Sequence, residues 1–309
     1  MQTAIIGAGA MGCLFGAMLA GAAPVVLVDP WQEHVAAINA KGLTVEGLDG
    51  RQRVHRLPVF NDPAAIEQPV DLAIIFTKSY RTEAAAGDAN RILKPDGLVL
   101  TLQNGIGNLE TIARVVGPQR AVAGVTAHGG TLLGPGRVRH AGVGPTHIAR
   151  PATAAQAVDR ICRFFVRAGI DTTAEENLDR LIWGKLVINV GINALAAILR
   201  VTNGAIGDTP ACEPLVAGAV AEAVAVAHAL GIRLPYKDPL QRVKAVCQAT
   251  AANRASMLQD ILRGARTEIG VINRAIVERG ATLGIATPSN RLLAEIVEAL
   301  EATAAHRVG

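Results

Sequence analysis

At 309 residues the chain is long for one domain, and two domains are the natural expectation. Half of the residues are hydrophobic and 18% are charged, a composition that supports a large buried core and argues against disorder. The net charge of +4 is scattered among acidic residues and aromatic residues make up only 3%, so a surface that binds nucleic acid is not expected.

The cysteines form neither a CxxC pair nor a cluster with histidine, which predicts reduced thiols in a cytoplasmic protein and no metal site. They are Cys13, Cys162, Cys212 and Cys247. The apolar N-terminal segment runs straight into a glycine motif with no basic residues before it, so a signal peptide is not expected. No uninterrupted apolar run reaches about 20 residues, so no membrane span is expected either.

The first half of the chain alternates strand-like and helix-like segments, as in a doubly wound parallel sheet. Short apolar runs predict buried strands at residues 2–6, 24–28, 72–76, 98–102 and 121–126. Helical spacing of apolar residues predicts helices at residues 10–21, 79–92 and 107–116. Two stretches break the alternation: residues 43–59 predict a small hairpin, and the glycine-rich residues 129–149 predict antiparallel edge strands.

After about residue 175 the apolar residues recur at helical spacing with almost no strand signal. Helices are predicted at residues 176–199, 210–230, 238–251, 266–283 and 289–304, with Pro210 and Pro288 as starts and Gly231 and Gly284 as stops. The expected fold class is therefore α/β, with a Rossmann-type domain at residues 1–174 and an all-helical domain at residues 175–309.

The strongest local signal is the segment Gly7-Ala8-Gly9-Ala10-Met11-Gly12, which follows the first predicted strand and opens the first predicted helix. A dinucleotide-binding GxGxxG motif requires this context. Gly7 permits the tight turn, Gly9 lets the backbone approach a pyrophosphate, and Gly12 lets the helix lie close to the strand. The helix N-terminus adds free N–H groups and a positive dipole end. The alternative is a glycine-rich turn that holds no ligand.

Asp29 ends the second predicted strand, about twenty residues downstream, where a dinucleotide site reads the adenosine ribose. A carboxylate there accepts hydrogen bonds from both ribose hydroxyls and repels a 2′-phosphate, which favours NAD over NADP. An ordinary turn aspartate before Pro30 is the alternative. Lys78 and Asn104 follow the third and fourth predicted strands, at the edge where open α/β sheets bind ligands, although solvated loop residues would occupy the same positions.

A polar stripe marks the predicted helix 176–199, because Lys185, Asn189 and Asn193 are spaced i, i+4 and i+8 among apolar neighbours. Solvent-facing stripes normally mix Lys, Glu and Arg, so one lysine with two asparagines favours the wall of a polar cleft over a wet edge. Two more polar clusters, at residues 253–260 and 267–269, are typical of helix caps and exposed faces when they are taken alone.

Together these motifs resemble the ketopantoate reductases (2-dehydropantoate 2-reductases) along the whole chain. The similar segments are Gly7–Gly12, the Lys78 segment, Gln103-Asn104-Gly105, Trp183-Gly184-Lys185-Leu186 with Asn189 and Asn193, Asn203-Gly204, Asn253 with Ser256–Asp260, and Thr267-Glu268-Ile269. The resemblance implies a dinucleotide-binding Rossmann domain, a helical domain for substrate binding and dimerisation, and a cleft between them. It also implies a nicotinamide-dependent reductase of a small 2-oxo acid, with a place in pantothenate biosynthesis.

The resemblance further implies a role for individual residues. Lys185 is similar to the family's proton donor, and Glu268 to a glutamate that lies where cofactor and substrate meet. Lys78 and Asn104 are similar to cofactor-side residues. The substrate-binding positions correspond to Asn189, Asn193, Asn203, Asn253 and Ser256. Hydride would pass from nicotinamide C4 to the 2-carbonyl carbon while the Lys185 ammonium stabilises the developing charge and delivers the proton.

One position departs from the family pattern. Members that use NADPH usually carry a basic residue just after the second strand, whereas residues 28–33, Val-Asp-Pro-Trp-Gln-Glu, offer acid and no base. NAD is therefore favoured over NADP, unless Gln32, Arg51 or Arg53 neutralises a 2′-phosphate while Asp29 caps the next helix. An NAD-dependent D-2-hydroxyacid dehydrogenase of the mandelate type is the alternative function, and a dinucleotide sensor without turnover is a weaker one.

Overall fold

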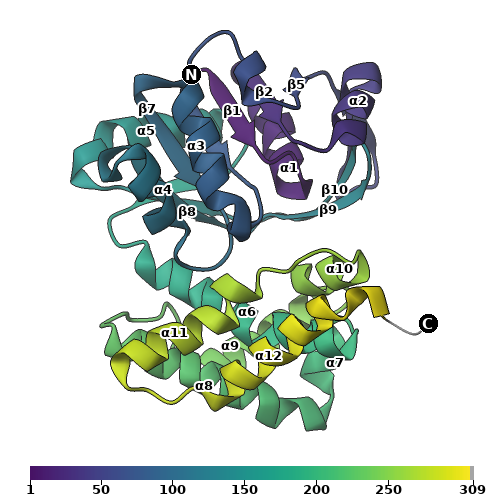
Figure 1. Cartoon of the computed structure of the whole chain (residues 1–309), viewed down its shortest axis with the longest axis vertical. Helices are drawn as coiled ribbons and strands as arrows, with labels where there is room; N and C mark the ends of the chain where they lie inside the picture. Colours follow the sequence, from purple (N-terminus) through teal and green to yellow (C-terminus); the bar gives the residue numbers. More distant parts are fainter. Residues whose placement is uncertain (307–309) are drawn as a thin grey trace. The chain divides into compact units, whose positions relative to one another are not determined.

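The computed structural model describes residues 1–306, which divide into two compact units (Figure 1). The first unit comprises Met1–Gln103 and Gly107–Leu178 and contains every strand that these residues form. The second comprises Asn104–Ile106 and the chain from Asp179 onward, and its regular elements are helices. The division falls after residue 178 rather than after residue 174, because β12 (Thr172–Glu175) still pairs with the sheet of the first unit. Residues 307–309 of the predicted helical domain lie outside the described residues.

The first unit is built on an eight-stranded sheet in the order β12-β11-β8-β7-β6-β1-β2-β5. Its other strands are β1 (Thr3–Ile6), β2 (Val25–Val28), β5 (Val59–Phe60), β6 (Val70–Ile75), β7 (Leu93–Thr101), β8 (Ala121–Thr126) and β11 (Thr146–Ala149). From β8 to β5 the neighbouring strands are parallel, and β11 is antiparallel to β8. The strand order reverses at β1, since β2 follows on one side and β6 on the other. Open α/β sheets bind ligands at such a point.

Helices cover both faces of this sheet, and they are α1 (Ala10–Leu19), α2 (Gln32–Lys41), α3 (Thr82–Ile92), α4 (Asn108–Val116) and α5 (Ala155–Arg167). Side chains of one strand alternate between the faces. Ile5 and Ile74 join the core beneath α1 and α5, whereas Ile6 and Ile75 join the core beneath α3 and α4. Burial on both faces explains why the central strands are continuous apolar runs, and the predicted parallel sheet is confirmed.

A second, four-stranded sheet has the order β4-β3-β10-β9. Its strands are β3 (Leu43–Glu46), β4 (Gln52–His55), β9 (Gly129–Gly134) and β10 (Arg137–Gly142). The hairpin predicted at residues 43–59 is confirmed as β3 and β4. The antiparallel strands predicted at residues 129–149 are confirmed, since β9 pairs antiparallel with β10 and β11 pairs antiparallel with β8. The edge position is confirmed for β9 and wrong for β10, which lies inside the second sheet because it also pairs in parallel with β3. Gly130 of β9 packs against the first turn of α1, where a Cβ would lie 3.2 Å from the carbonyl oxygen of Ala10.

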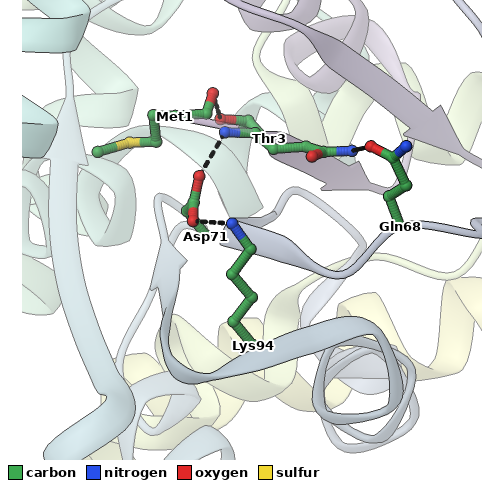
Figure 2. A network of polar contacts seen from close by, with 6 residues as sticks. Met1, Thr3, Gln68, Asp71 and Lys94 are labelled. Carbon is green, nitrogen blue, oxygen red and sulfur yellow. Dashed lines mark hydrogen bonds and ion pairs between the residues drawn. The ribbon is translucent and has the colours of Figure 1, made fainter.

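A polar network ties together the amino ends of β1, β6 and β7 (Figure 2). The Gln2 N–H donates to Asp71 Oδ2 at 2.7 Å, and Lys94 Nζ lies 2.6 Å from Asp71 Oδ1. Burial opposes ionisation of Asp71, but the hydrogen bonds from Lys94 and Gln2 prevail and hold the pKa of this carboxyl below its usual range. This network lies at the edge of the sheet opposite to the glycine loop, so the polar groups there serve the fold.

The second unit is a helical bundle around α6 (Asp179–Leu199), with α7 (Asn203–Asp208), α8 (Glu213–Ala229), α9 (Pro239–Ala249), α10 (Ser256–Leu262), α11 (Asn273–Leu283) and α12 (Pro288–Ala302). The predicted stops Gly231 and Gly284 take φ angles of 75° and 70°, in the left-handed region that glycine favours. Pro288 starts α12, as predicted, and Glu222 caps that helix by accepting from the Ser289 N–H at 2.7 Å.

Two helical segments of the second unit, α6 and Pro210–Ala229, are long and apolar enough to cross a membrane by length and composition. Most of the apolar stretch of α6 is buried inside the bundle, as in the core helix of a globular domain. Pro210–Ala229 is less than half buried.

Candidate functional site

The glycine loop after β1 holds three glycines with three different surroundings. Gly7 has φ +94°, and a Cβ on it would lie 2.6 Å from the Thr77 amide nitrogen after β6. A Cβ on Gly12 would lie 2.0 Å from the carbonyl oxygen of Gly7. Around a Cβ on Gly9 there is no atom of residues 1–306 within 4 Å. The protein itself occupies the space beside Gly7 and Gly12, and it leaves the space in front of Gly9 open.

The first turn of α1 offers N–H groups toward that open space. The first intrahelical bond runs from the Cys13 N–H to the Gly9 carbonyl at 2.9 Å, so the amides of the first turn, residues 10–12, precede it. No side chain of the described residues caps this end, and no acidic residue lies in the first turn. A helix end with uncapped amides and no acid fits an anionic group such as a pyrophosphate. The loop therefore meets the requirements of a dinucleotide phosphate site.

Asp29 leaves the sheet beside this loop, because Val28 accepts from the Gly7 N–H at 2.9 Å. The carboxylate is partly buried, and its Oδ1 accepts from the Trp31 N–H at 2.9 Å. Asp29 thus caps the approach to α2 through one of its two carboxylate oxygens. Of the basic residues considered for a 2′-phosphate, Arg51 lies 3.7 Å from Asp49 in the exposed turn between β3 and β4.

Gln103 joins the two loops that carry Lys78 and Asn104. Its Nε2 donates to the carbonyl oxygen of Thr77 at 2.8 Å and to Thr82 Oγ1 at 2.9 Å. The carboxyl ends of β6 and β7 are therefore cross-linked through one side chain. Lys78 and Asn104 are partly buried and follow directly on these fixed points. From the sequence Gln103 is distinguished only as a neighbour of Asn104, because its bonding partners lie more than twenty positions away.

The polar stripe of α6 lies partly inside the helical bundle. Lys185 and Asn189 are partly buried, and Asn193 is 6% exposed. Within residues 1–306 no group forms a hydrogen bond with the side chain of Asn189 or Asn193. An amide without a protein partner must bond to water or to a ligand, so these two side chains suit a polar ligand.

Burial lowers the pKa of Lys185 to about 8, and the negative charge of Glu268 opposes part of this effect. Glu268 is 7% exposed and precedes the short 3-10 helix Ile269–Val271. The structure therefore couples the lysine and the glutamate that the sequence had placed 83 positions apart. An ammonium group with a lowered pKa next to a carboxylate is suited to donate a proton near neutral pH.

The structure joins Asn203 and Asn253 through their backbones. The Asn203 N–H donates to the Asn253 carbonyl at 3.0 Å, and Asn203 Nδ2 donates to Thr250 Oγ1 at 2.9 Å. Asn203 Oδ1 is buried and has no hydrogen-bond partner among the described residues, so it remains available to a donor on a ligand. Asn253 itself is exposed, and Ser256 is the partly buried first residue of α10.

Two contacts of buried histidines in the first unit, His34 with Cys13 and His128 with His140, are not predicted from the sequence. His34 Nε2 lies 3.3 Å from Cys13 Sγ, and His128 Nδ1 lies 3.1 Å from His140 Nε2. His128 follows β8 and is 9% exposed, and its Nε2 has no partner among residues 1–306. Neither pair has a sequence signal, because the partners lie on different elements.

Acid is expected to destabilise the protein through these histidines. Burial lowers the pKa of His128, with help from His140, and burial also lowers the pKa of His34 and His140. A histidine held neutral in the fold contributes stability above its unfolded pKa of about 6.5, and that contribution is lost as the pH falls below this value. The loss amounts to at most about 1.4 kcal/mol per pH unit for each histidine that must gain a proton on unfolding.

Urea unfolding between pH 7 and pH 5 measures this effect. The variant His128→Phe keeps a ring beside Phe15, whose centroid lies 5.6 Å from that of His128, and it is expected to show a shallower dependence on pH. An equally steep dependence in the variant would show that His128 is not a source of the acid sensitivity.

Comparison with known proteins points to a single family. The family model described as "Ketopantoate reductase PanE/ApbA" matches residues 3–152, and the model of its C-terminal part matches residues 177–301. A 2-dehydropantoate 2-reductase of Halobacterium salinarum is 39% identical over 300 residues, covering 96% of this chain and 98% of the relative. One from Pyrococcus horikoshii is 38% identical over 302 residues, covering 97% and 98%.

Solved structures of two kinds are similar along nearly the whole chain. A PanE/ApbA family ketopantoate reductase from Ralstonia eutropha has a TM-score of 0.91 and 34% identity, covering 99% of this chain and 100% of its own. The ternary structure of D-mandelate dehydrogenase with NADH and anilino(oxo)acetate has a TM-score of 0.91 and 32% identity, with the same coverage.

Proposed function

The chain belongs to the ketopantoate reductase family and is an oxidoreductase, and from this premise we propose that it reduces the 2-carbonyl of a small 2-oxo acid with a nicotinamide hydride. The observation that carries the proposal is the stripe of α6, where the unpartnered amide of the buried Asn193 lies two helical turns from Lys185. Membership of an oxidoreductase family also removes the alternative of a sensor without turnover.

In this proposal the residues of the second unit have different roles toward the substrate. Lys185, as the ammonium, would stabilise the negative charge that develops on the carbonyl oxygen and deliver its proton. Glu268 would hold that ammonium in place through its opposite charge. The substrate carboxylate or hydroxyl would be oriented by Asn189, Asn193, Asn203, Asn253 and Ser256. Because Asn203 Oδ1 is buried and has no hydrogen-bond partner within residues 1–306, we assign it to a hydroxyl donor of the substrate.

The residues of the first unit would hold the dinucleotide. We propose that the amides of residues Gly7–Gly12 bind its pyrophosphate, since in the described part of the chain the space in front of Gly9 is open and no side chain caps α1. Asp29 would bind the adenosine ribose through the carboxylate oxygen that Trp31 leaves free, and Lys78 and Asn104 would bind on the nicotinamide side. The cofactor supplies the hydride, and the protein supplies position and field.

A spectrophotometric screen of 2-oxo acids with NADH and NADPH tests the function. Ketopantoate should give the fastest oxidation of the reduced cofactor if the chain acts as its named relatives do. The second candidate is a D-2-hydroxyacid dehydrogenase, favoured by Asp29 and by the similarity to D-mandelate dehydrogenase with NADH. In that case phenylglyoxylate should be reduced faster than ketopantoate. If no 2-oxo acid consumes either cofactor, the proposal is wrong.

NADH is expected to be preferred over NADPH by at least about tenfold in kcat/KM, which requires only about 1.4 kcal/mol. A carboxylate at Asp29 gains charge-assisted hydrogen bonds with the ribose diol. Against a 2′-phosphate a few ångströms away it meets a repulsion on the order of 4 kcal/mol at an effective dielectric constant near 20, before salt and rearrangement reduce it. Both effects favour NADH.

The variant Asp29→Asn is the sharp test of this preference, because asparagine keeps an oxygen that can accept from the Trp31 N–H and loses only the charge. We expect the ratio of kcat/KM for NADH over NADPH to shrink or reverse. If the wild-type enzyme prefers NADPH, the local charge does not set the choice and Gln32, Arg51 or Arg53 must reach the phosphate instead.

We also propose that two copies of the chain associate through the helical unit, as the resemblance implies. The segment Pro210–Ala229 is apolar and less than half buried, and Leu215 of α8 is 47% exposed. On α12, Leu292 and Ile296 lie one helical turn apart and are 57% and 36% exposed. Apolar faces of this kind are typical of interfaces between subunits. Membrane and nucleic-acid partners are not part of the proposal.

A further inference from the structure

Trp31 is an exposed aromatic residue in a chain that has few aromatic residues, and it follows Asp29 by two positions. The residue is 38% exposed, whereas the other tryptophan, Trp183, is 5% exposed. The Trp31 N–H donates to Asp29 Oδ1, and the Trp31 carbonyl accepts from the Val35 N–H at 3.1 Å. The N–H and the carbonyl of Trp31 are therefore both hydrogen-bonded at the start of α2, and this fixes the backbone from which the indole extends.

The indole lies flat on the imidazole of His34. Their ring centroids are 5.0 Å apart and the planes differ by 10°. His34 is fully buried, and its Nδ1 accepts from the Gly136 N–H at 3.1 Å. Because Nδ1 accepts, the proton of the neutral ring is on Nε2 and points toward Cys13 Sγ at 3.3 Å. The ring beneath Trp31 is thus held at both nitrogens, and the exposed area of the indole comes from its other face and its edges.

The same contacts connect Trp31 to the glycine loop. Cys13 Sγ donates to the carbonyl oxygen of Ala8, inside the loop, at 3.0 Å. Ala8, Cys13, His34 and Trp31 therefore form one continuous chain of contacts. The pairing of β1 with β2 brings the loop and Asp29 out of the sheet side by side. The backbone of Trp31 therefore follows the same carboxyl end of the sheet from which the glycine loop emerges.

We infer that Trp31 is a stacking platform for the adenine ring of the dinucleotide and that His34 positions it, an inference that rests on the proposed function. Adenine is bonded to ribose C1′, next to the carbon whose hydroxyl Asp29 would bind, so a base on Trp31 is within reach of a ribose on Asp29. Stacking on an aromatic ring uses the π-face of a base and ignores the 2′ position. Trp31 therefore adds affinity for both cofactors, and Asp29 decides between them.

Two fragments of the cofactor separate the base from the rest. ADP-ribose carries the adenine, and nicotinamide mononucleotide does not. In a Trp183→Phe background Trp31 is the only tryptophan of the chain, and ADP-ribose should quench its fluorescence while nicotinamide mononucleotide should not. Trp31→Ala should raise the Kd for ADP-ribose about tenfold, in the range of one base–aromatic stack, and Trp31→Phe should keep most of the affinity.

Steady-state kinetics give an independent readout. In Trp31→Ala the KM for NADH and for NADPH should rise by the same factor with kcat unchanged, so the ratio of the two cofactors stays constant. The matched control is Val166→Ala on α5, which removes an apolar side chain that is 55% exposed next to β12, at the other end of the sheet. That variant should bind ADP-ribose like the wild type.

The role of His34 is tested by a pair of variants. His34→Leu removes the ring beneath Trp31 and should reduce both the fluorescence quenching and the affinity for ADP-ribose, while His34→Phe restores a ring and should recover most of both. Equal ADP-ribose affinity in wild type and Trp31→Ala overturns the inference, as does equal quenching by the two fragments. If the wild-type protein oxidises NADH and Trp31→Ala has the same KM for NADH, the stacking platform is refuted and the proposed function stands. Wild-type protein that binds neither NADH nor ADP-ribose refutes the proposed function and the platform with it.

Discussion

Replacement of Lys185 by alanine is expected to lower kcat by about 10²–10⁴-fold, the range for loss of a general acid, with cofactor affinity nearly unchanged. Burial lowers the pKa of this ammonium to about 8, which brings its acidity close to the working pH. The neighbouring residues Trp183 and Leu186 remain to pack the core, and alanine is the best helix former, so α6 is expected to persist. Steady-state kinetics beside thermal unfolding separate the loss of chemistry from a loss of fold.

The pKa of Lys185 also predicts the direction in which the rates of reduction and oxidation change with pH. Reduction of the 2-oxo acid needs the ammonium form, so its rate should be full below pH 8 and fall as the pH rises through about 8. Oxidation of the 2-hydroxy acid needs the neutral amine and should rise through the same region. Lys185→Ala should lose this limb of both profiles.

Lys244 on α9 is the matched control, because it lies in the same unit and forms a 2.6 Å ion pair with Glu213. Lys244→Ala should keep both kcat and the pH profile. Near wild-type turnover in Lys185→Ala, or an unchanged limb near pH 8, would show that another group donates the proton.

The sequence was most informative where one local rule decides the structure. The buried strands of the parallel sheet are apolar on both faces, so their runs were recognisable, and the glycine loop has a fixed place between strand and helix. Gly231 and Gly284 were correct as helix stops because a left-handed residue is needed there. Each of these signals is contained in fewer than about ten neighbouring residues.

Several helices of the structure were not predicted from the sequence, and the physical reason differs from one helix to the next. On α2 only His34, Val35 and Ile38 are buried, and α7 has six residues, so neither shows a long apolar period. The helix predicted at residues 266–283 begins only at residue 273, because residues 269–271 form a 3-10 turn before it. The sequence of α5 does carry a helical pattern, since Val158, Ile161 and Phe165 recur at helical spacing, but this helix was not among those predicted.

The parts of the site that depend on tertiary contacts could not be predicted. The resemblance supplied Lys185 and Glu268, but their electrostatic coupling appears only once α6 and the 267–271 segment are folded in one unit. Gln103 acts through atoms of Thr77 and Thr82, more than twenty positions away. The placement of β9 and β10 in a second sheet depends on pairing with β3, which lies about 90 residues earlier in the chain.

The replacement Gly9→Val is expected to weaken dinucleotide binding by more than about tenfold, a loss of at least about 1.4 kcal/mol of binding free energy. Gly9 has φ −67°, outside the left-handed region, and among residues 1–306, its chain neighbours aside, no atom lies within 4 Å of the added Cβ. The variant should therefore fold with the wild-type unfolding temperature and lose affinity because its side chain fills the space assigned to the pyrophosphate. Titration with NADH and with ADP-ribose measures the loss.

Two other glycines make this result specific to the loop. Gly87 in α3 also has open space around its Cβ position, so Gly87→Val should leave both affinity and fold intact. Gly12→Ala should instead unfold at a lower temperature, because its Cβ would lie 2.0 Å from the carbonyl oxygen of Gly7 and the backbone must move. A loss of affinity in Gly9→Val without a loss of stability, together with normal binding in Gly87→Val, can come only from a ligand in the space that the protein leaves empty. Unchanged cofactor affinity in a folded Gly9→Val protein would remove Gly7–Gly12 from the dinucleotide site.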